Sequence, residues 1–309
     1  MNNKLLIVGT MAYDAIETPF GKVDKILGGA ATYIGLSASQ FSLDCAIISV
    51  VGEDFEEQHL ELLRRKGIDL SGVEIVSGGE TFFWSGKYHN DLNTRTTMET
   101  RLNVLENFNP IIPDHLRTPD IVMLGNLSPD VQFKALEQLK NKPKLIVLDT
   151  MNFWMEHFRS RLDEVIAKVD LISINDEEAR QLTGEYSLVK AAEKIHELGP
   201  QFIIIKKGEH GALLFHDSKI FCAPALPLEE VFDPTGAGDS FAGGFTGYLT
   251  QTGDISFRNM KSAVIYASAM ASFTVEKFGT ESLINYSSHS MDNRLKAFKE
   301  LTTFDIEIQ

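Results

Sequence analysis

Short continuous runs of apolar residues, each ending at glycine, asparagine or aspartate, constrain the fold of this chain more than any other feature of its sequence. The runs begin at Leu5, Cys45, Ile121, Lys144, Asp170 and Phe202. Val, Ile and Leu follow one another without alternating with polar residues, which is typical of strands buried on both faces of a parallel sheet. The sequence therefore predicts an α/β fold with a mainly parallel sheet and right-handed crossovers.

The stretches between the runs have the residue spacing of helices. Asp54 is expected to cap a helix that runs to Lys66 and stops at Gly67. Further helices are expected at 131–140, 156–168, 188–198, 238–250 and 257–274. Strand and helix thus alternate through most of what we expect to be a single domain spanning residues 1–309.

Two segments break this alternation. ETPFGKVDKIL, from Glu17, has a turn signal between strand-like flanks, and the segment from Glu80 mixes aromatic residues, Thr and Arg without a helical period. One βαβ-like unit separates them, so we expect them to meet in space as a small β-sheet lid contributed by about 14–27 and 80–106. Loops and lids at the carboxyl edge of a parallel sheet are where ligands usually bind.

The segment VFDPTGAGDSFAGGF, residues 231–245, places Gly236 and Gly238 at the entrance of a helix. Glycine lets a ligand approach backbone amides closely, and amides at a helix entrance are unpaired donors at the positive end of the dipole. The turn is therefore a candidate phosphate site. Asp239 is either a base for a hydroxyl that attacks the phosphate or an acid favoured by the dipole. Gly243 and Gly244 lie inside the helix and are assigned to close packing.

Composition and missing motifs argue against several other classes of protein. The sequence has 29 Lys and Arg against 43 Asp and Glu, a net charge of −14, which disfavours broad nucleic-acid or anionic-membrane surfaces. It has no GxxxxGK, HExxH or CxxC motif, and its two cysteines fit a reducing, cytoplasmic setting. The apolar run after Lys4 is too short for a signal peptide or a membrane span.

The string DPTGAGDSFAGGF closely resembles the C-terminal signature of the PfkB or ribokinase-like family of ATP-dependent carbohydrate and nucleoside kinases. Four further segments match that family in the expected order: Asp14, the diglycine Gly28 and Gly29, the NxxE motif of Asn175 and Glu178, and KKGEHGA at Lys206 to Ala212. The match covers nearly the whole chain. It implies a ribokinase-like three-layer α/β/α sandwich with a small β-sheet lid.

The resemblance implies roles for the residues of the phosphate turn. Asp239 would be the catalytic base, and the amides of Gly236, Ala237 and Gly238 would form the anion hole for the γ-phosphoryl group of ATP. Pro234 replaces the usual threonine of the signature and leaves these residues intact.

Metal positions are implied in the same way. Asn175 and Glu178 would organise Mg²⁺, largely through water and phosphate oxygens. Asp233 matches a position that contributes to a K⁺ site in some members. Taken without the resemblance, Asn175 would simply end a strand and Glu178 would lie on a solvated helix face.

The remaining candidates divide between acceptor and nucleotide. The candidate acceptor-binding residues are Asp14, Gly28, Gly29, Tyr33 and Asp149. The candidate nucleotide-binding residues are Lys206, Gly208, Gly211, Val275 and Gly279. Tyr33 stands where many members have an asparagine that binds sugar hydroxyls, so the identity of the acceptor stays open.

Three functions follow from these residues. The first is ATP-dependent phosphorylation of a hydroxymethyl group of a sugar or polyol, the second is phosphorylation of a nucleoside 5′-hydroxyl (adenosine, inosine or cytidine), and the third is a nucleotide-binding regulator without turnover. The aromatic residues expected in the lid are Phe82, Phe83, Trp84 and Tyr88. Three interpretations of them stay open: they stack on a nucleobase or sugar face, form the lid's own core, or pack against a second subunit. Lid pairing in the family implies a homodimer, and no nucleic-acid or membrane partner is expected.

Overall fold

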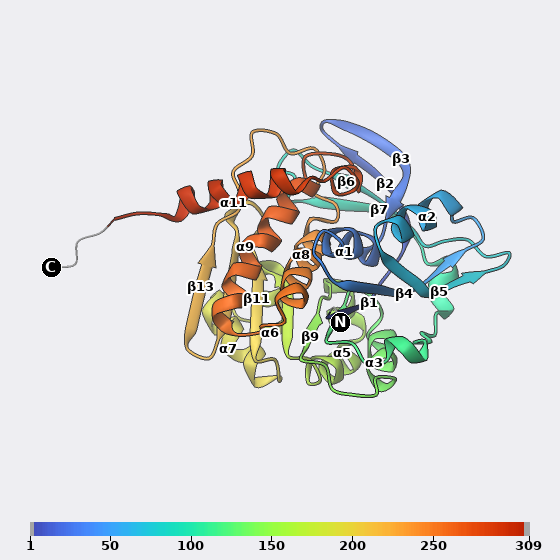
Figure 1. Ribbon diagram of the computed structural model, residues 1–309, viewed down its shortest axis with the longest axis horizontal. Helices are drawn as coiled ribbons and strands as arrows, with labels where there is room; N and C mark the ends of the chain where they lie inside the picture. The colour runs from blue at the N-terminus through green and yellow to red at the C-terminus, as the bar shows by residue number, and fades with distance from the viewer. Residues whose placement is uncertain (1–2, 306–309) are drawn as a thin grey trace.

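The main sheet of the protein contains the predicted apolar runs. The computed structural model describes residues 3–305, and residues 1–2 and 306–309, the ends of the expected 1–309 domain, lie outside the described residues. Within the described part, nine strands are arranged in the order β13-β12-β11-β10-β9-β8-β1-β4-β5 (Figure 1). Their bounds are β1 Lys4–Val8, β4 Asp44–Gly52, β5 Ile68–Val76, β8 Ile121–Leu124, β9 Leu145–Leu148, β10 Leu171–Asn175, β11 Phe202–Lys206, β12 Ala212–His216 and β13 Lys219–Ala223.

Every pairing from β11 across to β5 is parallel, and only β12 and β13 are added in antiparallel fashion. The six apolar runs correspond to β1, β4, β8, β9, β10 and β11, which confirms the predicted mainly parallel sheet. Because the strands are parallel, the residues that follow them gather at one edge of the sheet.

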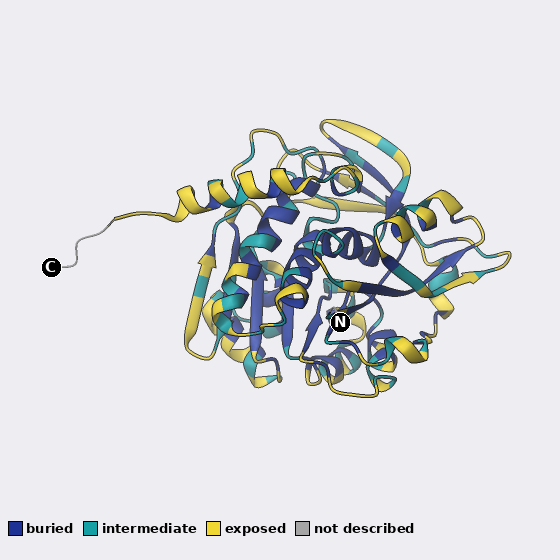
Figure 2. Ribbon diagram, viewed as in Figure 1, coloured by how far each residue is buried: buried dark blue, intermediate teal, exposed yellow. Residues whose placement is uncertain are grey.

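Helices cover both faces of this sheet and complete a three-layer α/β/α sandwich (Figures 1 and 2). Side chains alternate between the layers: Leu5 and Ile7 of β1 enter one core cluster, and Leu6 and Val8 enter the other. The helices of the first cluster are α1 Ala30–Ala38, α2 Glu57–Arg65, α8 Ala237–Thr252, α9 Phe257–Thr274, α10 Glu281–Ile284 and α11 Ser288–Thr302. Those of the second are α3 Pro129–Glu137, α4 Asn152–His157, α5 Arg159–Ile166, α6 Asp176–Thr183 and α7 Leu188–Glu197.

A second, four-stranded sheet is built from the two segments that interrupt the alternation. Its order is β3-β2-β6-β7, with β2 Ala12–Thr18, β3 Gly21–Gly28, β6 Phe83–Tyr88 and β7 Arg95–Arg101. β2 and β6 pair in parallel, so the two distant segments do meet in one small sheet. Short 3₁₀ turns complete the described elements: η1 Asn103–Asn107, η2 Asp114–Leu116 and η3 Gly208–His210.

Two expectations about helix ends were wrong. Asp54 does not cap α2, whose N-cap is Glu56. The Asp54 carboxylate instead accepts hydrogen bonds from the backbone N–H and the hydroxyl of Thr81, both at 2.7 Å, so a tertiary partner outcompetes the local cap. The helix expected at 156–168 is divided into α4 and α5, because the backbone of Phe158 leaves the helical conformation.

The packing of α8 against its neighbours relies on glycine, as the sequence predicted. A Cβ on Gly243 would overlap the backbone of Ile34 in α1, and a Cβ on Gly244 would lie 2.9 Å from the Met270 side chain in α9. Ser240 adds a polar contact between the two helices, because its carbonyl accepts a hydrogen bond from the Ser37 hydroxyl of α1 at 2.7 Å. These contacts fix the entrance of α8 relative to α1.

Candidate functional site

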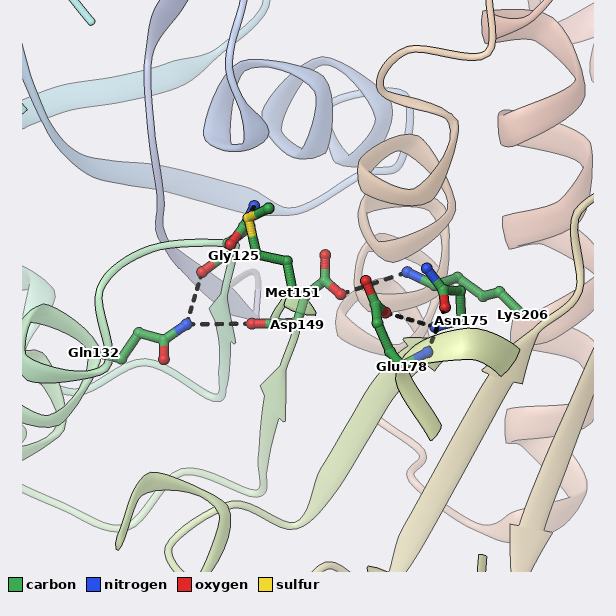
Figure 3. A network of polar contacts seen from close by, with 8 residues as sticks. Gly125, Gln132, Asp149, Met151, Asn175, Glu178 and Lys206 are labelled. Carbon is green, nitrogen blue, oxygen red and sulfur yellow. Dashed lines mark hydrogen bonds and ion pairs between the residues drawn. The ribbon is translucent and has the colours of Figure 1, made fainter. Parts of the chain in front are cut away.

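Three polar residues lie where neighbouring parallel strands end. Asp149 follows β9, Asn175 is the last residue of β10, and Lys206 is the last residue of β11. Asn175 and Lys206 are register partners. Figure 3 shows their side chains converging at the carboxyl edge of the sheet, beside the entrance of α8.

The glycine-rich turn forms that helix entrance. Gly236 is the N-cap of α8 and has a left-handed backbone with φ of 74°. The Ala237 N–H donates to the Pro234 carbonyl at 3.2 Å, which closes the turn, and the Gly236 carbonyl accepts from the Ser240 N–H at 2.8 Å. The N–H groups of Gly238 and Asp239 belong to the first helical turn, where no intrahelical acceptor exists. The turn therefore presents donors to an anion.

Lys206 reaches this turn, whereas the sequence placed it on the nucleotide side. Its ammonium would lie 3.2 Å from a Cβ built on Gly238, and it forms an ion pair with Asp149 at 3.5 Å. Burial lowers the pKa of Lys206, but Asp149, Glu178 and Asp239 together raise it above its usual value. Lys206 is thus a charged ammonium surrounded by three carboxyl groups.

The carboxyl groups around Lys206 titrate unusually high. Burial, then the charge of Asp149, raises the pKa of Asp239 to about 7, while Lys206 and Arg95 oppose the shift. Burial and Asp149 also raise the pKa of Glu178 to about 7. Raised pKa values of this kind arise where burial and neighbouring carboxylates outweigh the nearby cations.

Asn175 and Glu178 form the N-terminal cap of α6. The Asn175 side chain accepts from the Glu178 N–H, and the Glu178 carboxylate accepts from the Asn175 N–H, both at 2.8 Å. Asn175 does end a strand, as one interpretation held, but Glu178 is buried and does not lie on a solvated face. The cap leaves one carboxylate oxygen of Glu178 directed toward the cluster (Figure 3).

Asp149, a candidate acceptor-binding residue, lies beside Lys206 and Glu178. Gln132, which sequence reasoning missed, holds the backbone of Asp149: its amide donates to the carbonyls of Gly125 at 2.9 Å and of Asp149 at 3.2 Å (Figure 3). Gln132 lies in α3, and no sequence motif marks it as part of the site.

The diglycine lies on the other side of the turn, next to Asp14 in β2. A Cβ on Gly28 would overlap the Asp14 carboxylate, and a Cβ on Gly29, whose φ is 92°, would lie 2.5 Å from the Thr10 carbonyl. Both positions therefore require glycine. Burial, followed by the charges of Asp233 and Asp239, raises the pKa of Asp14 to about 8. Tyr33, in the first turn of α1, is fully buried here with its ring against Gly236.

Asp233 ties the glycine turn to the segment after α9. Its two carboxylate oxygens accept from the backbone N–H groups of Thr235 and Gly279, each at 2.9 Å. The Val275 carbonyl accepts from the N–H groups of Phe232 and Asp233. Val275 and Gly279 are thus held beside the turn.

Gly208 and Gly211 lie in the turn that follows β11. Gly208 has a φ of 55°, and a Cβ there would lie 3.0 Å from the Asn93 side chain in the β6–β7 loop. Gly211 has a φ of 85° and packs on the backbone at the end of β13. Packing and backbone conformation therefore account for both glycines.

The small sheet contacts the glycine turn directly, which sequence reasoning did not foresee. The Thr235 hydroxyl donates to the Tyr88 hydroxyl of β6 at 3.2 Å. Arg95 of β7 is the register partner of Tyr88. Of the other aromatic residues, Phe83 lies under the guanidinium of Arg101 at 4.3 Å and packs on the core. The aromatic residues of the sheet thus have partners within the chain.

Comparison with known proteins identifies the family. The family model described as "pfkB family carbohydrate kinase" matches residues 2–285. The chain belongs to this family. It is therefore a phosphotransferase with a hydroxyl group as acceptor, and the fold and enzyme class expected from the sequence are confirmed.

Relatives within the pfkB family act on several acceptors. A cytidine kinase from Thermococcus kodakarensis is 31% identical over 247 residues, covering 78% of this chain and 86% of the relative. A nucleoside kinase from Methanothermobacter thermautotrophicus is 27% identical over 309 residues, covering 91% and 92%. A solved structure of a putative ribokinase II from E. coli in complex with ATP and Mg²⁺ has a TM-score of 0.78 at 20% identity, covering 95% of this chain and 99% of that one.

Residues 3–305 contain neither a helix that could span a membrane nor a preformed cluster of metal-binding side chains. No helix there is both long and apolar enough to cross a bilayer. No group of three or more His, Cys, Asp or Glu side chains in the same residues is arranged to hold a metal ion.

Proposed function

We propose that this pfkB-family enzyme transfers the γ-phosphoryl group of ATP to a hydroxymethyl group, with Asp239 as the general base. The observation that carries the proposal is the position of Asp239 in the first turn of α8, beside the free amides and within the charge cluster of Lys206. A base whose pKa lies near 7 is matched to proton transfer at neutral pH.

The proposed step balances as an in-line displacement. The acceptor oxygen forms a bond to the γ-phosphorus, the bond to the ADP oxygen breaks, and the acceptor proton goes to the Asp239 carboxylate. The N–H groups of Gly238 and Asp239, which have no intrahelical acceptor, donate to the phosphoryl oxygens, and the Lys206 ammonium balances their charge. The Ala237 N–H instead closes the turn through the Pro234 carbonyl. Asp149 and Gln132 fix Lys206 in place.

Magnesium fits the donor set of the cluster. Asp149 and Glu178 are oxygen donors, the charge of Asp149 raises the pKa of Glu178, and a divalent cation would relieve that repulsion. Since residues 3–305 hold no three-carboxylate cage, the ion would bind mainly through water and phosphate oxygens, organised by Glu178 and Asn175. When bound, Mg²⁺ supplies charge neutralisation at the β- and γ-phosphates.

For the acceptor, we place a nucleoside first and a sugar or polyol second, which reverses the order that the sequence suggested. The reason is that the 31% and 27% identical relatives are a cytidine kinase and a nucleoside kinase. A regulator without turnover is disfavoured because the base, the amide turn and Lys206 are assembled together. Measuring ADP release from Mg·ATP in the presence of cytidine, other nucleosides, sugars or polyols decides among these three functions.

A K⁺ site, a homodimer and a cytoplasmic setting are further parts of the proposal. A K⁺ ion near Asp233 would use the carboxylate lone pairs that the Thr235 and Gly279 amides leave free. Comparing turnover in KCl with turnover in tetramethylammonium chloride tests this site.

The homodimer through the small sheet is supported by β7, all of whose residues are exposed (Figure 2), and sedimentation equilibrium tests it. The free cysteines Cys45 and Cys222 fit a cytoplasmic setting, which fractionation of cells producing the protein tests.

Replacing Asp239 by asparagine should remove the base while keeping the shape of the turn. We expect Asp239→Asn to lose roughly two to four powers of ten in kcat, the scale of general-base catalysis, while the affinity for ATP stays within a few fold. Steady-state kinetics and ATP titration measure the two. An unchanged kcat would falsify the role of Asp239.

The acid limb of the pH profile should report the raised pKa of Asp239. Asp239 acts as a base only when deprotonated, so kcat/KM at saturating Mg·ATP should rise with pH through about 7 and then level off. Lys206→Met should move this limb to higher pH, because Lys206 lowers the pKa of Asp239. ATP has the same ionisation in the assays of both enzymes, so it cannot cause a difference between them. An acid limb at the same pH in wild type and in Lys206→Met would contradict the assignment of Asp239 as the base.

Replacing Glu178 by glutamine should weaken the metal site more than the fold. Glutamine retains the capping oxygen for the Asn175 N–H but loses the charge. We expect Glu178→Gln to raise the Mg²⁺ concentration at half-maximal rate by roughly ten-fold or more, as for other groups that orient bound metals. A Mg²⁺ titration with the same curve as wild type would rule out this role.

A further inference from the structure

The C-terminal helix α11 lies outside the part of the chain that the family model matches. That match ends at residue 285, and α11 begins at Ser288. The helix packs against α9, and its Met291 and Phe298 are buried in the first core cluster (Figure 1). The family match therefore assigns no role to α11, although the helix is an integral part of this fold.

One polar side chain of α11 contacts the C-terminal end of α9 at three residues. The Arg294 guanidinium lies 3.5 Å from the centroid of the Phe273 ring. It donates hydrogen bonds to the Ser272 hydroxyl and to the Glu276 carboxylate. Only 12% of the Arg294 side chain is exposed. A planar guanidinium stacks on a ring and donates in two directions at once, which the compact ammonium of lysine does not reproduce.

The helix end that this guanidinium holds leads directly into residues 275–279, which include two candidate nucleotide-binding residues. The Val275 carbonyl accepts from the Asp233 N–H at 3.3 Å, and the Gly279 N–H donates to the Asp233 carboxylate at 2.9 Å. Residues 275–279 are therefore bonded to the strand of chain that enters the glycine-rich turn. Through Glu276, the same residues are bonded to α11.

Backbone hydrogen bonds alone hold this helix end weakly. The N–H groups of Val275, Glu276 and Lys277 donate to helix carbonyls at 3.3, 3.3 and 3.5 Å, longer than the usual distance of about 2.9 Å. The contacts made by Asp233 and Arg294 therefore determine where residues 275–279 lie.

We propose that Arg294 is a positioning residue for the nucleotide: it holds Glu276 and thereby sets the position of residues 275–279 beside Asp233. The inference rests on the proposed function and on the assignment of Val275 and Gly279 to the nucleotide. The contacts of Arg294 lie at the end of α9, whereas the diglycine lies at the start of α1. Loss of Arg294 should therefore weaken ATP binding much more than acceptor binding.

Arg294→Met tests the proposal, because methionine keeps an apolar stem against the Phe273 ring but has neither the charge nor the donors. We expect the Kd for Mg·ATP, measured by isothermal titration calorimetry, to rise at least about ten-fold, the scale of one lost charge-assisted hydrogen bond. KM for the acceptor that the screen selects should stay within about two-fold. Arg294→Lys should give an intermediate Kd, because lysine restores the charge without the planar fork.

Arg161→Met is the matched control for a purely structural effect. The Arg161 guanidinium lies 4.7 Å from the centroid of the Phe133 ring and pairs with Asp130 at 2.8 Å, in the other helix layer. Whatever its effect on Tm, this variant should leave the Kd for Mg·ATP unchanged. All variants are compared at a temperature at which circular dichroism shows them folded.

Glu276→Ala identifies the contact through which Arg294 acts, and it carries the test if Arg294→Met does not fold, because it leaves α11 intact. Glu276→Ala alone should also raise the Kd for Mg·ATP, and the Kd of the double variant should lie within about two-fold of that of Arg294→Met.

Three results overturn the inference alone: an unchanged Kd in Arg294→Met or in Glu276→Ala, effects that multiply in the double variant, or equal rises in the Kd for Mg·ATP and the KM for the acceptor. Wild-type protein that does not bind Mg·ATP overturns the proposed function, and this inference with it.

Discussion

The close approach of α8 to α1 is the contact on which the rest of the site depends. Gly243 lets the helices touch through the backbone of Ile34, and Gly236 lets the Tyr33 ring lie against the first turn. A larger residue at either position would move the helix entrance away from the strand ends. The same contact therefore holds the glycine-rich turn beside Lys206 and the Tyr33 ring against Gly236.

Around this entrance, the protein buries more negative charge than it balances. Asp149, Glu178 and Asp239 surround the Lys206 ammonium, and burial leaves their pKa values raised although Lys206 lowers all three and Arg95 lowers those of Glu178 and Asp239. In a stable core such an arrangement destabilises the folded state unless something compensates it. The Mg²⁺ ion and the polyphosphate that we propose for this cluster would bring both signs of charge into it and relieve this imbalance.

The small sheet is coupled to the chemistry through two short links. Tyr88 receives a hydrogen bond from Thr235 in the turn, and Asp14 in β2 lies against the diglycine that starts α1. Asp233 extends the same network to Gly279. Movement of the small sheet would therefore shift the diglycine and the glycine-rich turn together. In the function that we propose, such a movement would exclude water from the transfer.

The sequence by itself determined the strands of the parallel sheet and the glycine-bounded helix entrance, because continuous apolar runs and a Gly-rich turn before a helix are local patterns with few structural solutions. The class of enzyme followed from the resemblance of several ordered motifs to the pfkB family, which the family model confirms. Tertiary structure alone decided which polar residues meet. Lys206 lies beside Gly238 because β11 ends next to α8, and Asp54 does not cap its helix because Thr81, distant in sequence, offers two donors. Gln132 and Tyr88 carry no motif at all. Their roles arise only from the strands and helices that bring them within hydrogen-bond distance, and no spacing along the chain encodes that distance.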